Sequence, residues 1–148
     1  IVNDSMGAYV ADAAIKKMIE AGQAPKKSKV VILGLTFKEN CPDTRNSKVD
    51  DIIKHLNTYG IKPIIVDPWA SERDALQEYG VKLTKLENVK DVDCVIVAVA
   101  HNEFKELGLG RVRELYRDVS DKEKVLIDVK GLYAVKELRE TNMTWWRL

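Results

Sequence analysis

The alternation of short apolar runs with helical segments constrains this fold most. The runs KVVILGL, KPIIVD, DCVIVAVA and KVLIDV are rich in β-branched residues and apolar at consecutive positions, which is typical of strands covered on both faces of a parallel sheet. We expect strands near residues 29–35, 62–66, 93–99 and 124–129, and the brief run VKLT could add a fifth. The segments between them are long enough for crossover helices. This order predicts an α/β fold of three layers with a mainly parallel, doubly wound sheet.

A long helix precedes the predicted sheet. Val10, Ala14 and Met18 recur at helical spacing, as do other apolar residues of this segment, so residues from about 4 to 21 read as one amphipathic helix. The chain opens on Ile1 without an initiator Met and already in this pattern, and we therefore expect it to be a piece of a longer protein. We expect the helix to project from the sheet with its apolar stripe incompletely buried, which predicts self-association or fraying of residues 1–20.

Composition narrows the class of partner. The 148 residues carry 24 Lys and Arg against 23 Asp and Glu, a formal net charge of +1, so no broad field attracts nucleic acid or an anionic membrane. We expect neither partner. No apolar stretch approaches the roughly 20 residues that span a bilayer, and the start lacks the blocks of a signal peptide. Cys41 and Cys94 are the only cysteines, too few for a disulfide framework, which favours a cytoplasmic protein.

Polar residues follow the ends of the predicted strands, where open parallel sheets bind ligands. The first strand runs into a loop that contains Gly34 but no G-x-G-x-x-G finger, and in its place stand Lys38 and Arg45. Both cations suit phosphate oxygens, although a solvated loop in which Arg45 pairs with Asp43 or Glu39 is the alternative. The candidates for this rim are Phe37, Lys38, Asn40, Asp43, Thr44, Arg45, Asp67, Pro68, Trp69, His101, Asn102, Asp128 and Lys130.

Two of these positions, and Cys41 in the same loop, allow a functional and a structural interpretation. Asp67 ends the second strand, where a dinucleotide-binding domain keeps a ribose-binding carboxylate, but its spacing from Gly34 exceeds the usual 20 or so residues, and capping of the DPW turn is favoured. His101 could donate to a ligand or make a local hydrogen bond, and the latter is favoured. Cys41 lies near Lys38, which favours a thiolate, yet no base can be assigned to it. The His and Cys residues show no metal-site spacing.

Three ordered motifs give a family resemblance. The run GLTFKENCPDTRNSKVDDII, followed by DPW and AVAHNEF, resembles the C-terminal, UDP-binding domain of the UDP-glucose/GDP-mannose dehydrogenase family, which is Rossmann-like. The first run is similar to the branch that oxidises UDP-N-acetylhexosamines to uronic acids for bacterial surface polysaccharides. The resemblance covers nearly the whole chain and weakens over RETNMTWWRL. Its opening resembles the end of the family's central helical segment, which implies that residues 1–25 belong to that dimerisation segment and residues 26–148 to the UDP-sugar-binding domain.

The resemblance also implies roles for single residues. Phe37 and Lys38 match the family's FK pair, which contacts the UDP-sugar, and Arg45 matches the DTR arginine that reaches NAD across a domain interface. Lys130, in DVKG, matches a substrate-side position at which relatives use Arg or Lys. Neither the NAD finger nor the family's active-site cysteine motif is present, and Cys41 stands in a different motif. The resemblance therefore implies a fragment with no catalytic residue and no metal, inactive alone, whose complete enzyme is an NAD-dependent homodimer with an N-terminal NAD-binding domain and a central domain.

Two other classes of function stay open on sequence grounds. A free-standing Rossmann-type nucleotide-binding or regulatory module would bind a nucleotide without catalysis. A non-enzymatic interaction domain that uses the long first helix would dimerise without nucleotide affinity. A Gly-rich βαβ unit and a cysteine motif upstream of Ile1 would decide for the dehydrogenase.

Overall fold

The sheet has five strands, and all neighbouring pairs are parallel. The computed structural model describes the backbone of residues 2–148 and the side chains of residues 6–148. The strand order is β2-β1-β3-β4-β5, with Val31 opposite both Ile64 of β2 and Val95 of β3. The mainly parallel sheet expected from the sequence is therefore confirmed. The strands are β1 (Val30–Leu33), β2 (Ile64–Val66), β3 (Cys94–Val97), β4 (Val125–Asp128) and β5 (Thr144–Arg147).

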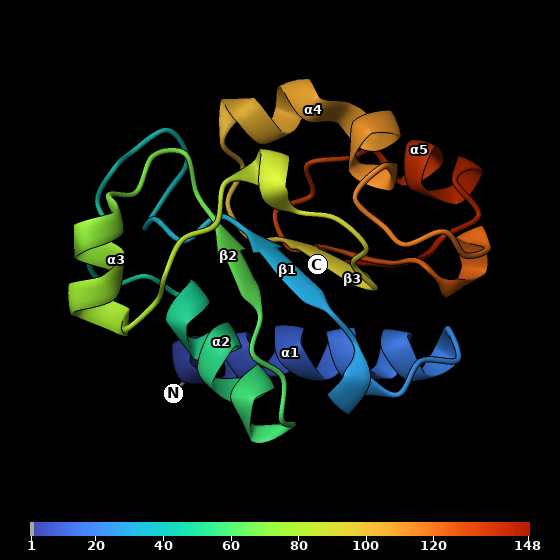
Figure 1. The fold of residues 1–148 in the computed structure, drawn as a ribbon, viewed down its shortest axis with the longest axis horizontal. Coiled ribbons are helices and arrows are strands. Elements are labelled where there is room, and N and C mark those ends of the chain that lie inside the picture. The colour runs from blue at the N-terminus through green and yellow to red at the C-terminus, as the bar shows by residue number, and fades with distance from the viewer. Residues whose placement is uncertain (1) are drawn as a thin grey trace.

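Helices cover both faces of this sheet, which makes the three layers (Figure 1). Helices α1 and α2 lie on one face, and α4 and α5 lie on the other, while α3 lies beyond the β2 edge. The helices are α1 (Val2–Glu20), α2 (Val49–Thr58), α3 (Glu72–Tyr79), α4 (Asn102–Arg113) and α5 (Val135–Glu140), with short 3₁₀ turns at Pro25–Lys27, Leu86–Asn88 and Asp121–Glu123. None of the helices within residues 2–148 is long and apolar enough to cross a membrane.

Each central strand supplies both cores, because successive side chains point to opposite faces. Val30 and Ile32 of β1 pack with α1 and α2, whereas Val31 and Leu33 pack with the residues under α4 and α5. All four are fully buried or nearly so. The continuous apolar run is thus explained by burial on both faces.

Helix α1 forms where the pattern predicts it, but the expectation that it projects from the sheet is wrong. It contacts α2, β3, β4 and β5, and Val10, Ala14 and Met18 are completely buried. The buried part of the apolar stripe therefore packs in one core with α2 and the sheet. Met6 and Ile19 lie on the exposed side of the helix, 40% and 61% accessible.

The fifth strand is not the VKLT run suggested by the sequence. In that run Leu83 makes only an isolated parallel bridge to Ile65. The fifth strand is β5, in the C-terminal stretch, where Trp145 and Trp146 pair with Leu126 and Ile127. Trp146 also packs edge-on against Tyr9 of α1, with ring centroids 5.7 Å apart. Aromatic content was the available signal for this strand.

Strand β1 lies between β2 and β3, and this order positions the site. Because all strands run the same way, the loops after β2 and β3 flank the loop after β1 at the carboxyl ends of the strands. Gly34 lets the chain after β1 pack closely against Val99, which follows β3. Its φ is +109°, and a Cβ there would lie 2.5 Å from the Cβ of Val99. Only glycine accepts both constraints.

Candidate functional site

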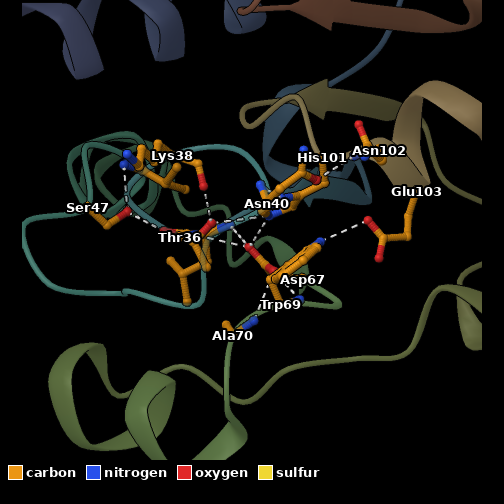
Figure 2. Close-up of polar contacts among 12 residues, drawn as sticks. Thr36, Lys38, Asn40, Ser47, Asp67, Trp69, Ala70, His101, Asn102 and Glu103 are labelled. Carbon is orange, nitrogen blue, oxygen red and sulfur yellow. Dashed lines mark hydrogen bonds and ion pairs between the residues drawn. The ribbon is translucent and has the colours of Figure 1, made fainter.

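Asp67 is the centre of a polar network at the carboxyl ends of β1, β2 and β3 (Figure 2). Its Oδ2 accepts hydrogen bonds from the backbone N–H groups of Leu35 and Thr36, at 2.6 and 3.0 Å. Its Oδ1 accepts from Trp69 and Ala70, at 2.7 and 3.1 Å. The carboxylate therefore caps its own turn, as favoured from the sequence, and also ties that turn to the loop after β1.

The charge of Asp67 is stabilised by these donors. Burial would raise the pKa of this fully buried carboxyl, but hydrogen bonds from His101, Leu35 and Thr36 outweigh it and keep the pKa below that of an ordinary Asp. With five N–H donors around it, the carboxylate has no free direction toward a ribose. The interpretation of Asp67 as a dinucleotide's ribose acceptor is thus disfavoured by the geometry.

His101 joins the third strand end to the same loop. The imidazole is completely buried, with Nε2 3.0 Å from Asp67 Oδ2 and 3.1 Å from Thr36 Oγ1. Its Nδ1 accepts from the backbone N–H of Asn40 at 3.0 Å. Both ring nitrogens therefore make internal hydrogen bonds, in agreement with the local role favoured from the sequence.

Aromatic rings enclose the imidazole. Trp69 stacks on it with centroids 6.1 Å apart and an interplanar angle of 25°, and Phe104 lies 5.5 Å away. The indole N–H of Trp69 donates to Glu103 at 2.9 Å, so the lid over His101 is itself fixed.

The loop that follows β1 is anchored a second time, to α3. Thr44 Oγ1 donates to Glu78 at 2.5 Å, and the Tyr79 hydroxyl donates to the Thr44 carbonyl while accepting from the Ser47 N–H. Arg45 lies between these anchors with its side chain 77% exposed and paired with Asp43, Nε to Oδ1 at 3.0 Å. The predicted alternative of an Arg45–Asp43 pair is therefore present in the structure.

The structure places the predicted binding residues on one edge of the sheet. Phe37, Lys38 and Arg45 all lie in the loop after β1 and are exposed, Phe37 by 49%. Lys130 is exposed in the loop after β4, on the far side of β3. Asp128 holds that loop, since it accepts from the N–H groups of Leu132 and Tyr133 at 2.9 Å each.

A groove of about 340 Å³ opens beyond β2, and Asp67, Glu103 and Phe104 of this network form part of its lining. Its lining is mostly apolar and does not include Phe37, Lys38, Arg45 or Lys130. The described residues hold no cluster of three or more metal-ligating side chains. Both cysteines are free, and burial raises the pKa of the Cys94 thiol, which makes it unreactive.

The sequence places Asp67 and His101 on the same rim but does not predict their direct pairing, and Thr36 is not among the candidates that it indicates. Their connection depends on the order β2-β1-β3, which brings the ends of β2 and β3 to either side of β1. The doubly wound sheet that the sequence predicts brings both strand ends to one rim but leaves open which strands are neighbours.

The fold defines an α/β domain of the doubly wound, Rossmann-like class, and its loop after β1 carries exposed cationic side chains where a Gly-rich finger would otherwise stand. Residues 31–135 match the model of the UDP-glucose/GDP-mannose dehydrogenase family, UDP binding domain. The chain belongs to this family.

Relatives agree with this assignment. The chain is 43% identical over 131 residues to UDP-N-acetyl-D-glucosamine 6-dehydrogenase of Pseudomonas aeruginosa, covering 88% of the chain and 30% of that protein. It is 41% identical over 136 residues to the Salmonella typhi enzyme of the same name, covering 92% and 31%. The chain therefore spans about a third of the length of these relatives.

A solved structure confirms the fold. The crystal structure of NDP-N-acetyl-D-galactosaminuronic acid dehydrogenase from Methanosarcina mazei Go1 superposes with a TM-score of 0.85 at 20% identity, covering 99% of the chain and 30% of that protein. The Rossmann-like architecture expected from the resemblance is thereby confirmed.

Proposed function

We propose that this chain is the UDP-sugar-binding part of an NAD-dependent UDP-N-acetylhexosamine 6-dehydrogenase. The observation that carries the proposal is the fixed segment 36–40 at the carboxyl edge of the sheet. Its backbone is held by buried groups while the side chains of Phe37 and Lys38 face outward. Membership of the family and the names of the relatives support the reaction class.

The two side chains of the FK pair suit different parts of a UDP-sugar. Lys38 offers a compact positive charge for the diphosphate, and Phe37 offers an aromatic face for the uridine or the sugar. Lys130 approaches from the loop after β4 and would neutralise further charge on the substrate side. It lacks the planar fork of an arginine, so it would bind as a point charge.

Arg45 would serve the NAD side of the cleft. Nε and Nη2 of its guanidinium pair with the carboxylate of Asp43, and the rest of the group faces solvent. The rest of the NAD site would lie elsewhere, because the carboxylate of Asp67 is already occupied by internal donors and no Gly-rich finger follows β1. NAD would accept hydride from the sugar C6, and its main binding site would lie in a domain outside residues 1–148.

The proposal therefore includes further domains. Residues 1–25 would continue a central helical segment, which would dimerise the complete enzyme, and residues 26–148 would form the UDP-sugar-binding domain. Since the catalytic cysteine motif of the family is not in this sequence, the chain alone would produce no NADH. The free cysteines fit a reducing, cytoplasmic setting.

The test is turnover by the complete protein. Incubated with NAD and UDP-N-acetylglucosamine or UDP-N-acetylmannosamine, it should release two NADH for each sugar oxidised to the acid, while residues 1–148 release none. Absence of NADH with every UDP-N-acetylhexosamine would contradict the proposal. Retained UDP binding in that case would favour a free-standing nucleotide-binding module.

A further inference from the structure

His101 connects buried groups to both ends of the exposed Phe37–Lys38 segment (Figure 2). At one end, Nε2 lies 3.1 Å from the hydroxyl of Thr36. At the other, Nδ1 accepts from the backbone N–H of Asn40. The imidazole is completely buried, so water does not compete for either bond.

The hydrogen bonds of its neighbours fix the protonation of the ring. The Thr36 hydroxyl donates its only hydrogen to the carbonyl of Lys38, at 3.0 Å, and so it can only accept from His101. The carboxylate of Asp67 likewise only accepts. Nε2 must therefore carry the hydrogen, and Nδ1, which accepts from Asn40, must be bare.

This arrangement leaves the segment little freedom. The N–H of Thr36 is held by Asp67, the carbonyl of Lys38 by Thr36, and the N–H of Asn40 by His101. The side chain of Asn40 in turn accepts from the N–H of Asn102, next to His101. Thr36 and Asn40, which flank the exposed segment, are thus both hydrogen-bonded to residues that follow β3.

We infer that His101, as the neutral Nε2–H tautomer, is a positioning residue that holds Phe37 and Lys38 in the geometry that binds the UDP-sugar. It acts through Thr36 and Asn40 and touches no substrate itself. This inference rests on the proposed function, because it assumes that Phe37 and Lys38 contact the ligand. A purely structural histidine would change stability and leave substrate affinity unaltered.

The tautomer is tested directly on the chain by long-range ¹H–¹⁵N NMR of the imidazoles at neutral pH. His55 is the internal control, because it is partly exposed and pairs with Asp12. We expect a protonated Nε2 and an unprotonated Nδ1 for His101. A protonated Nδ1 would overturn the inference, and this result needs no mutation.

Two substitutions separate the two halves of the ring. His101→Gln places an amide donor near the Nε2 position and removes the acceptor for Asn40, whereas His101→Asn keeps an acceptor near Nδ1 and removes the donor to Asp67 and Thr36. In the complete enzyme, both should raise KM for the UDP-sugar, by about five- to ten-fold, with kcat little changed. His55→Asn is the matched control and should leave KM unchanged.

Coupling to Lys38 decides between positioning and a general loss of stability. Because His101 acts through the segment that carries Lys38, adding His101→Gln to Lys38→Ala should raise KM much less than it does in the wild-type background. If Lys38→Ala alone leaves KM unchanged, the proposed function fails. Thermal denaturation will show whether the two His101 variants are folded. If Lys38→Ala raises KM but both folded His101 variants leave KM unchanged, the positioning role is overturned.

Discussion

At the scale of single residues, we propose separable roles for Lys38 and Arg45. In the complete enzyme, Lys38→Ala should mainly raise KM for the UDP-sugar and Arg45→Ala should mainly raise KM for NAD. Each lost charge-assisted contact should cost about 1.5 to 3 kcal/mol, roughly ten-fold to a hundred-fold in kcat/KM. Measuring both Michaelis constants for each variant checks this. Equal, small effects on both constants would remove the assigned roles.

Asp67 predicts a specific dependence of stability on pH. Its pKa is lower in the folded chain than in the unfolded one, so its charge stabilises the fold above the unfolded value of about 4, and this contribution is lost as pH falls through the folded value. Asp67→Asn should cost about 1 to 3 kcal/mol at neutral pH, because buried donors lose their carboxylate.

Urea unfolding of the wild type and of Asp67→Asn at several pH values measures this dependence. The difference in free energy of unfolding should shrink as the pH is lowered below about 4. The control is Asp118→Asn, which changes an exposed carboxyl. A difference that stays constant down to the acid limit would contradict the assignment of the lowered pKa to Asp67.

At the scale of elements, the contact between α1 and α2 depends on one glycine. A Cβ on Gly7 would lie 2.4 Å from the Cβ of Asp51 and 3.1 Å from the N of Ile52, so Gly7→Ala should separate the helices and cost about 1 to 3 kcal/mol. Gly110→Ala in α4 meets nothing within 4 Å and should be neutral or slightly stabilising. Chemical denaturation of both variants measures the contrast, and equal effects would show that α1 does not cross α2 this closely.

The elements show why local patterns predict some features and miss others. The apolar run around Val30–Leu33 predicts β1, because a strand buried on both faces needs apolar residues at every position. The apolar stripe on α1 predicts a helix but not the elements that bury it, since periodicity identifies an apolar face and not its packing partners. Strand β5 has half-exposed tryptophans and lies at an edge, and such a strand lacks the continuous apolar signal.

Most members of the candidate site, though not Thr36, were predictable from the sequence, but their hydrogen bonds to one another were not. Lys38 and Arg45 are visible as cations after a strand, and their exposure follows from their loop. The pairing of Asp67 with His101 joins residues 34 positions apart and depends on strand order, which the apolar pattern does not specify. For that reason the buried network can be identified only once the order of the strands in the sheet is known.

At the scale of the whole molecule, α1 should fold together with the sheet. Its amides around Val10–Met18 should be protected from hydrogen exchange to about the same extent as those of β1, because both belong to one core. Exchange of these amides well ahead of the β1 amides would show that α1 frays, as its sequence alone suggested. Residue-resolved hydrogen exchange of the chain checks this.

The central claim is that the edge carrying Phe37, Lys38 and Lys130 binds the uridine nucleotide. Chemical-shift mapping of residues 1–148 by NMR during titration with UDP tests it most directly, because the method registers weak binding and locates it. We predict saturable shifts over residues 36–40 and near Lys130. We expect none at the amino ends of the strands, where Gln23 and Arg117 both donate to Asp93, directly before β3. Shifts confined to the groove beyond β2, or no shifts at millimolar UDP, would contradict the account.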